Sequence, residues 1–266
     1  VRPGSVIDKE AEKRATSVYL VDRTIPMLPE HLCNGICSLR PNEEKLAYSC
    51  IFEMDDNANI INHRIRKTVI KSDRRFTYEE AQEIIETGKG DYAEEVLTLD
   101  RLAKALRKRR FEHGSVNFDR FEVRFEIDET GHPISVYFKV SKDANKLVEE
   151  FMLLANKQVA TDIGNPGGRK KAKPFVYRIH DNPDPDRMTN FAEIANRFGY
   201  KVRTTGKRTD INNSLNKMLS SVKGKPEENL LSILAIRSMS KAVYSTVNVG
   251  HYGLAFDYYT HFTSPI

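Results

Sequence analysis

The clearest alternation of apolar and polar residues lies between residues 46 and 55. Every second side chain there is apolar, which predicts a half-buried β-strand with these residues on one face: Leu46, Tyr48, Cys50, Phe52 and Met54. A polar turn at 55–59 leads to an extended stretch at 60–71, which predicts an antiparallel partner. A second hairpin is predicted over 121–140, where RFEVRFEI and ISVYFKV flank a turn at Asp128–Gly131.

Helical periodicity and helix-start signals predict most of the remaining chain. Thr77 and Glu80 have the spacing of a capping box, so a helix is expected from Tyr78 to Gly88. Apolar residues at three- and four-residue spacing predict a long helix that begins at Asp143. The other expected helices span 8–21, which Pro26 and Pro29 would follow, and 93–111, 185–198, 210–222 and 227–244. We therefore predict one mixed α/β (α+β) domain over 1–266, with antiparallel strands packed by helices.

Composition narrows the class of protein but not its function. Hydrophobic residues make up 39% and charged residues 30% of the 266 residues, which is typical of a folded globular chain. The sequence has no apolar run of membrane-spanning length and no signal-peptide pattern, so no membrane partner is expected. A net charge of +5 favours a polyanionic partner without requiring one. The odd set Cys33, Cys37 and Cys50 favours reduced thiols and a cytoplasmic location over a zinc site.

Residue patterns alone leave the chemistry open. Asp181, Asp184 and Asp186 lie in a proline-broken loop, where a solvated turn is favoured over a metal site. Basic clusters at 64–75, 101–110 and 169–173 could contact phosphates or simply face water. The aromatic residues with basic clusters nearby could stack on bases or belong to the core: Tyr19, Tyr78 and Phe118. These patterns indicate a mixed domain that could bind nucleic acid.

Seven segments in order give a stronger signal. They are SVYLVDRTIPMLPEHL, NGICSLRPNEEKL, SDRRFTYEEAQ, GSVNFDRFEVRFEID, KLVEEFMLLAN, FVYRIHDNP and RSMSKAVYSTVNVGHYGLAFDYYTHFTSPI. Together they resemble the catalytic RNB domain of the ribonuclease II/ribonuclease R family, and most closely its bacterial ribonuclease R branch. The resemblance extends over essentially the whole chain. It implies an RNB-type catalytic domain of a 3′→5′ exoribonuclease, which acts on single-stranded RNA.

The resemblance also implies roles for four residues. Tyr19 matches a tyrosine that stacks on the terminal base of the RNA, and Phe118 an aromatic residue that clamps the other end of the base stack. Tyr78 and Glu149 match residues that select RNA over DNA. A phenol or a carboxylate can bond the 2′-hydroxyl that DNA lacks, which gives this role a chemical basis. Glu150 points about 100° away on the helix and is expected to have a structural or solvent-facing role.

The resemblance further implies that the catalytic domain is incomplete here. The Mg²⁺-binding aspartates of the family would precede Val1–Ser5, and its catalytic arginines would follow Ile266, at a helix start announced by Thr263–Pro265. No catalytic or metal-binding residue is therefore expected within 1–266, and RNA-binding barrel domains are expected in the flanking sequence. The first hypothesis is a hydrolytic exoribonuclease that releases nucleoside 5′-monophosphates, with this chain inactive alone. The alternative is a catalytically inactive, RNA-binding member of the family.

Overall fold

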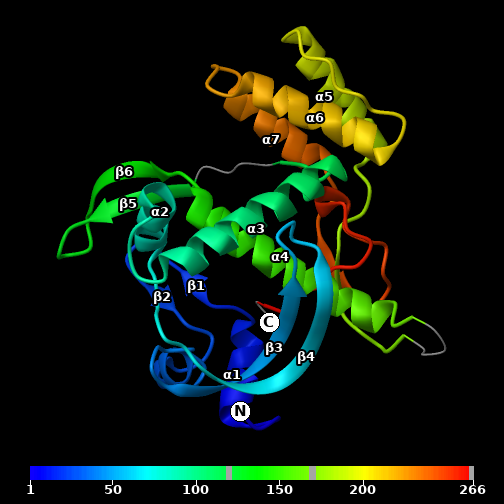
Figure 1. Ribbon diagram of the computed structural model, residues 1–266. Helices are drawn as coiled ribbons and strands as arrows, with labels where there is room; N and C mark the ends of the chain where they lie inside the picture. The colour runs from blue at the N-terminus through cyan, green and yellow to red at the C-terminus, as the bar shows by residue number, and fades with distance from the viewer. Residues whose placement is uncertain (118–121, 168–171, 264–266) are drawn as a thin grey trace.

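Two long helices form the centre of the molecule. The computed structural model describes residues 1–117, 122–167 and 172–263. Helices α3 (Ala93–Glu112) and α4 (Asp143–Gly164) lie side by side, and α2 (Tyr78–Thr87) packs against both (Figure 1). A curved hairpin of β3 and β4 wraps one side of this centre, and a hairpin of β5 and β6 projects from the other. This arrangement confirms the predicted mixture of helices and antiparallel strands.

The start of α2 shows why its position could be predicted. Thr77 Oγ1 accepts a hydrogen bond from the Glu80 backbone N–H at 3.1 Å, and the Glu80 carboxylate accepts one from the Thr77 N–H at 2.7 Å. These reciprocal bonds satisfy two backbone donors that the first helical turn leaves without partners. The helix ends at Gly88, whose φ of +70° suits a residue without a side chain. The predicted capping box is confirmed, and the helix places Tyr78 at its first position.

The hairpin of β3 (Glu44–Met54) and β4 (Ile60–Lys71) is confirmed: β4 has its predicted bounds, whereas β3 begins before the predicted residue 46 and ends before residue 55. The prediction that one face of β3 is buried is only partly correct. Phe52 is half-buried near the turn, but Leu46 is 87% exposed and Tyr48 57% exposed. The turn end packs against α3 and α4, whereas the other end curves beyond them (Figure 1). Alternation predicts which residues share a face, but only the surrounding chain decides whether that face is covered.

The hairpin of β5 (Glu122–Ile127) and β6 (Pro133–Lys139) is also confirmed, although the predicted first residue, Phe121, lies outside the described residues. Asp128 shapes the turn, because its carboxylate accepts hydrogen bonds from the backbone N–H groups of Thr130 and His132 at 2.8 and 2.9 Å. One face of the hairpin is apolar and largely exposed; it comprises Val123, Phe125, Ile134, Val136 and Phe138.

The predicted N-terminal helix is too long. Helix α1 spans Val6–Arg14 and ends where Ala15 adopts a φ of +60°. The chain then forms β1 (Val18–Tyr19), which pairs with β2 (Thr24–Ile25), and a π-helical turn, η1 (His31–Ile36), follows. Ser17 Oγ accepts a hydrogen bond from the Met27 N–H at 3.0 Å, which holds the chain back on itself. Serine and β-branched residues favour such local alternatives over a helix interior.

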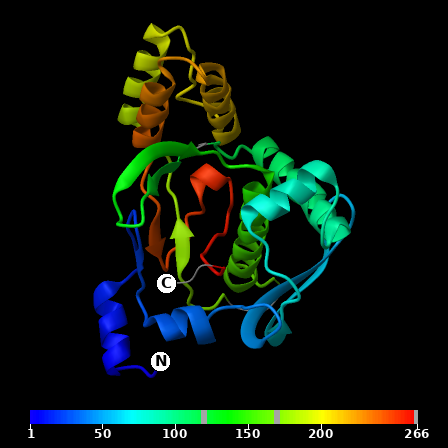
Figure 2. The same ribbon diagram turned by 90° about the vertical axis from the view of Figure 1, so that its left-hand side faces the viewer.

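The C-terminal helices form a bundle above the centre (Figures 1 and 2). Helices α5 (Pro185–Arg197) and α6 (Arg208–Val222) match their predictions, but α7 (Glu228–Ser238) ends before the predicted residue 244. The segment Val243–Ser245 is instead strand β8, which pairs with β7 (Tyr177–Ile179). The partner lies about 65 residues away in the sequence, so local periodicity could not reveal it.

The bundle contains the larger of two hydrophobic clusters. Its fully buried side chains come from all three helices and include Ala195, Leu215, Val222, Leu231 and Ala235. Val116 from the loop after α3 and Tyr252 from the C-terminal segment belong to the same cluster, so the bundle is packed onto the central helices. A smaller cluster joins Leu153 of α4 to Phe256 and Tyr259. Both clusters therefore hold the C-terminal segment, residues 248–263, against the rest of the fold.

Candidate nucleic-acid interface

Two adjacent glutamates on α4 lie in opposite environments. Glu150 is 3% exposed, and its carboxylate accepts hydrogen bonds from Arg110 Nη2 at 2.5 Å and from Arg110 Nε at 3.2 Å. Arg110 is buried as well, and it donates to Ser115 Oγ at 2.7 Å. A bidentate, fully hydrogen-bonded pair is the form in which two opposite charges are tolerated inside a protein. Glu150 therefore has the structural role that was its expected default.

The Glu149 carboxylate faces solvent at the same level of α4. Its side chain is 48% exposed, and its nearest cations are Arg110 Nη2 at 3.4 Å and Arg107 Nη1 at 3.7 Å. These longer contacts leave acceptor capacity on the carboxylate. The geometry suits acceptance of a hydrogen bond from a ligand hydroxyl group.

The arginines beside the two glutamates also hold the loop after α3. Arg107 Nη2 donates to Asn117 Oδ1 at 3.4 Å. The backbone N–H of Asn117 donates to Asn216 Oδ1 at 2.8 Å, and Asn216 Nδ2 donates to the Ser115 carbonyl at 2.8 Å. The loop is thus bonded to both α3 and α6 immediately before Phe118. Phe118 itself, predicted to clamp the base stack, lies outside the described residues.

Tyr78 lines a cleft of about 660 Å³ formed by α2, α3 and the start of α4. Its side chain is partly exposed, and Lys139 of β6 lies over its ring at 5.7 Å from the centroid. Val148, the neighbour of Glu149 in the sequence, lines the same cleft. Tyr78 and the start of α4 thus border one cleft, whereas the Glu149 carboxylate lies beside Arg107 and Arg110.

Tyr19 lies elsewhere. It is 80% exposed on β1, and it does not line the cleft that contains Tyr78. Helix α1 lies at the edge of the molecule opposite the α5–α7 bundle (Figure 2). The exposed Tyr19 ring is accessible for stacking.

The basic cluster at 101–110 has mainly internal partners. Arg109 donates to Asn59 Oδ1 at 3.0 Å and to the Asn57 carbonyl at 2.8 Å, and Arg101 donates to the Asp56 carbonyl at 2.7 Å. These bonds fasten the β3–β4 turn to α3. The arginine side chains of this cluster therefore serve the fold, whereas most of the cluster at 169–173 lies outside the described residues.

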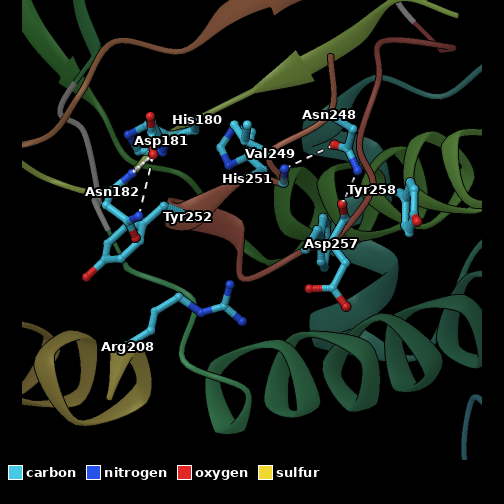
Figure 3. A pocket seen from close by; sticks show the side chains of 12 residues that line it. His180, Asp181, Asn182, Arg208, Asn248, Val249, His251, Tyr252, Asp257 and Tyr258 are labelled. Carbon is cyan, nitrogen blue, oxygen red and sulfur yellow. Dashed lines mark hydrogen bonds between the residues drawn. The ribbon is translucent and has the colours of Figure 1, made fainter. Parts of the chain in front are cut away.

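A small polar pocket lies where the C-terminal segment meets β7 and α6 (Figure 3). It encloses about 360 Å³ and is lined by residues 180–182, 248–252 and 256–258 and by Arg208. His180 Nδ1 accepts the Gly253 N–H at 3.0 Å, and His251 Nδ1 accepts the Leu254 N–H at 3.2 Å. Both histidines are therefore acceptors that shape the backbone of the C-terminal segment.

Burial keeps these histidines neutral. It lowers the pKa of His251 to about 3, with the nearby His180 ring as a second cause, and it also lowers the pKa of His180. A group that titrates so far below neutrality is a poor general acid or base near pH 7. The sequence patterns did not single out either histidine, although both lie in segments that contribute to the family resemblance.

The described residues do not supply a metal site. Asp184 Oδ1 accepts hydrogen bonds from the Asp186 and Arg187 N–H groups at 3.1 and 3.0 Å, so it caps α5. Across 1–117, 122–167 and 172–263, no group of three histidine, cysteine or acidic side chains could hold a metal ion. Within the same ranges, no helix is both long and apolar enough to cross a bilayer.

Comparison with known proteins identifies the family. The sequence model of the RNB domain family matches residues 1–266. The chain therefore belongs to the RNB family. It is 40% identical to ribonuclease R 1 of Lactococcus lactis, over 100% of this chain and 33% of that protein. It is 39% identical to ribonuclease R of Aquifex aeolicus, over 100% of this chain and 38% of that protein.

A solved structure agrees. RNase R of Mycoplasma genitalium in complex with ribose methylated single-stranded RNA superposes with a TM-score of 0.88 at 27% identity. The match covers 100% of this chain and 42% of that chain. This chain therefore spans less than half the length of each of these relatives, which leaves room in them for further domains.

Proposed function

We propose that the protein containing this chain is a 3′→5′ exoribonuclease that hydrolyses single-stranded RNA to nucleoside 5′-monophosphates. The observation that supports this most strongly is the RNB match over all 266 residues, together with ribonuclease R relatives at 39–40% identity. The RNA-bound M. genitalium relative supports RNA as the ligand class.

The RNA contacts proposed here use the exposed groups of the interface. Glu149 accepts a hydrogen bond from a ribose 2′-hydroxyl, and Tyr78 contributes to the same selection of RNA over DNA. The exposure of the Glu149 carboxylate beside two arginines supports this role. Tyr19 and Phe118 stack on bases, and the 80% exposure of Tyr19 makes its ring available. A stacked base contributes about 1–3 kcal/mol to binding.

Catalysis is proposed to depend on groups outside this chain. By the family resemblance, aspartates preceding Val1 bind Mg²⁺, an arginine following Ile266 contacts the scissile phosphate, and flanking barrel domains bind RNA. Metal ions would activate water and stabilise the leaving oxygen. Because the described residues hold no group that fits a metal ion, we expect residues 1–266 alone to release no nucleotides.

A cytoplasmic location is part of the proposal. The described thiols of Cys33, Cys37 and Cys50 are all free, as in a reducing compartment. Fractionation of cells that express the tagged protein would check this, and recovery in an oxidising compartment would contradict it.

A degradation assay tests the proposed activity. The complete protein and residues 1–266 are incubated with 5′-labelled single-stranded RNA, with Mg²⁺ or with EDTA. The complete protein should release 5′-monophosphates from the 3′ end only with Mg²⁺, and the shorter chain should release none. RNA binding by the complete protein without any release would favour the inactive, RNA-binding alternative.

A further inference from the structure

One buried amide on α4 holds the C-terminal segment. Asn156 is 3% exposed, and its Oδ1 accepts hydrogen bonds from the backbone N–H groups of Phe262 and Thr263 at 2.8 and 2.9 Å. The Thr263 hydroxyl donates to the same oxygen at 3.1 Å. Asn156 Nδ2 donates to the Tyr259 hydroxyl at 3.3 Å. One side chain thus contacts three residues that lie more than 100 positions later in the chain.

These contacts fix the path of residues 259–263 across α4. The Phe262 ring lies edge-on to Tyr48 of β3, with ring centroids 6.0 Å apart, so the segment is seated between α4 and the β3–β4 hairpin. Asn156 Oδ1 thus gives two partly buried backbone N–H groups an acceptor, and a backbone donor withdrawn from water without one is costly.

The same helix presents Glu149 two turns earlier. Seven positions separate the two residues, which corresponds to about two turns and about 10 Å along the axis. They therefore point to nearly the same side of α4. A rigid helix thus sets the distance between the exposed carboxylate and the held segment, since neither group depends on a flexible loop.

We propose that Asn156 is a positioning residue for the reaction. It holds Phe262 and Thr263 so that the residues after them meet the scissile phosphate at a fixed distance from the sugar bound by Glu149. This inference rests on the proposed function, because it assumes that the residues following Thr263 reach the reacting phosphate. Asn156 itself touches neither the RNA nor the reacting atoms in this arrangement.

Four variants separate positioning from a general packing role. Asn156→Leu keeps the side-chain shape but removes the acceptor. Asn156→Asp keeps the acceptor oxygen, and the Tyr259 hydroxyl can donate to the second oxygen of the new carboxylate. Thr263→Val removes only the hydroxyl. Gln158→Leu is the matched control, because it removes another α4 amide, whose Nε2 donates to Asp162 Oδ1 at 2.8 Å without contacting the segment.

The first readout does not require activity. Amide hydrogen exchange in residues 1–266 should show protected Phe262 and Thr263 N–H groups. Asn156→Leu should remove this protection, whereas Asn156→Asp and Gln158→Leu should keep it. Retained protection in Asn156→Leu would show that Asn156 does not hold the segment.

The second readout uses the complete protein. Asn156→Leu should lower kcat about 10- to 100-fold with little change in KM, since misplacing groups by about 1 Å costs on this order. Asn156→Asp should restore most of kcat, and Gln158→Leu should leave it near the wild-type value. Combining Asn156→Leu with Thr263→Val should lower kcat no further than Asn156→Leu alone.

The outcomes are distinguishable. An active wild-type protein whose kcat is unchanged in Asn156→Leu, or equally reduced in Gln158→Leu, overturns the inference while the proposed function stands. A complete wild-type protein that releases no nucleotides overturns the proposed function and the catalytic part of the inference with it. The exchange experiment then still decides whether Asn156 holds the segment.

Discussion

Glu149 and Glu150 show how much a single step along a helix can change the role of a side chain. Both are glutamates and neighbours, yet one is buried in a bidentate pair with Arg110 and the other is half exposed. Of these two glutamates, only Glu149 was assigned the role of selecting RNA over DNA by the family resemblance. Helical geometry predicted that Glu150 points elsewhere, but the identity of its partner came only from the packing of α3 against α4.

Removal of the buried carboxylate should destabilise the fold. Glu150→Ala leaves the Arg110 guanidinium buried without its partner, which should reduce the free energy of unfolding by about 3–5 kcal/mol. Glu149→Ala, the adjacent control, should cost less than about 1 kcal/mol because its carboxylate is half exposed and its ion-pair contacts are long, at 3.4 and 3.7 Å. Urea denaturation of residues 1–266 measures both. Equal losses for the two variants would contradict the assignment.

Acidification should destabilise the C-terminal segment through His251. Its folded-state pKa of about 3 lies below the ordinary value of 6.5, so between these values the unfolded state binds a proton that the folded state does not. Stability should therefore be complete above about pH 6.5 and fall as the pH is lowered towards 3. His180 and His261, whose pKa values are also lowered, should add to the loss.

A pH series of urea midpoints tests this. His251→Asn removes the titrating group while it keeps an acceptor for the Leu254 N–H, so it should flatten the decline between pH 6.5 and 4. His113→Asn, at an exposed position, serves as the control. An unchanged slope in His251→Asn would contradict the account.

At the scale of elements, local signals predicted what is locally determined. The capping box placed α2, alternation placed β3 to within two residues at each end, and β4 followed as its partner. The errors occurred where pairing with another strand decides the structure. Val243–Ser245 forms a strand only because Tyr177–Ile179 lies beside it, and Val18–Tyr19 leaves the predicted helix to pair with Thr24–Ile25.

Loss of the capping box should weaken α2 measurably. Thr77→Ala removes the acceptor for the Glu80 N–H and should cost about 1 kcal/mol of stability. Thr87→Ala, at the last residue of the same helix, is the control and should cost less than about 0.5 kcal/mol. Thermal or urea denaturation measures the difference, and a harmless Thr77→Ala would contradict the proposed cap.

At the scale of the whole molecule, the candidate site could be predicted only in part. Tyr78 lines the cleft between α2, α3 and the start of α4, whereas Glu149 lies beside two arginines and Tyr19 is exposed on β1. Asn156 and His180 were not predicted, since their roles come from contacts with segments more than 70 residues away. A sequence pattern has no means of ranking such buried polar residues.

The exposed apolar face of the β5–β6 hairpin should make residues 1–266 associate in solution. Val136 is 59% exposed within this face, and patches of this kind favour self-association. Val136→Lys should shift the chain towards monomer in light scattering. Tyr137→Lys, which adds the same charge on the opposite face, should shift it less. A monomeric wild-type chain would contradict this expectation.

The central claim is that an RNB exoribonuclease reads ribose through Glu149. The most direct test is the rate of nucleotide release by the complete protein from single-stranded RNA and from DNA of the same sequence. Wild type should strongly prefer RNA, and Glu149→Ala should reduce that preference about tenfold or more, the value of a hydrogen bond to a charged group. The same preference in Glu149→Ala as in wild type, or no release from RNA at all, would contradict the account.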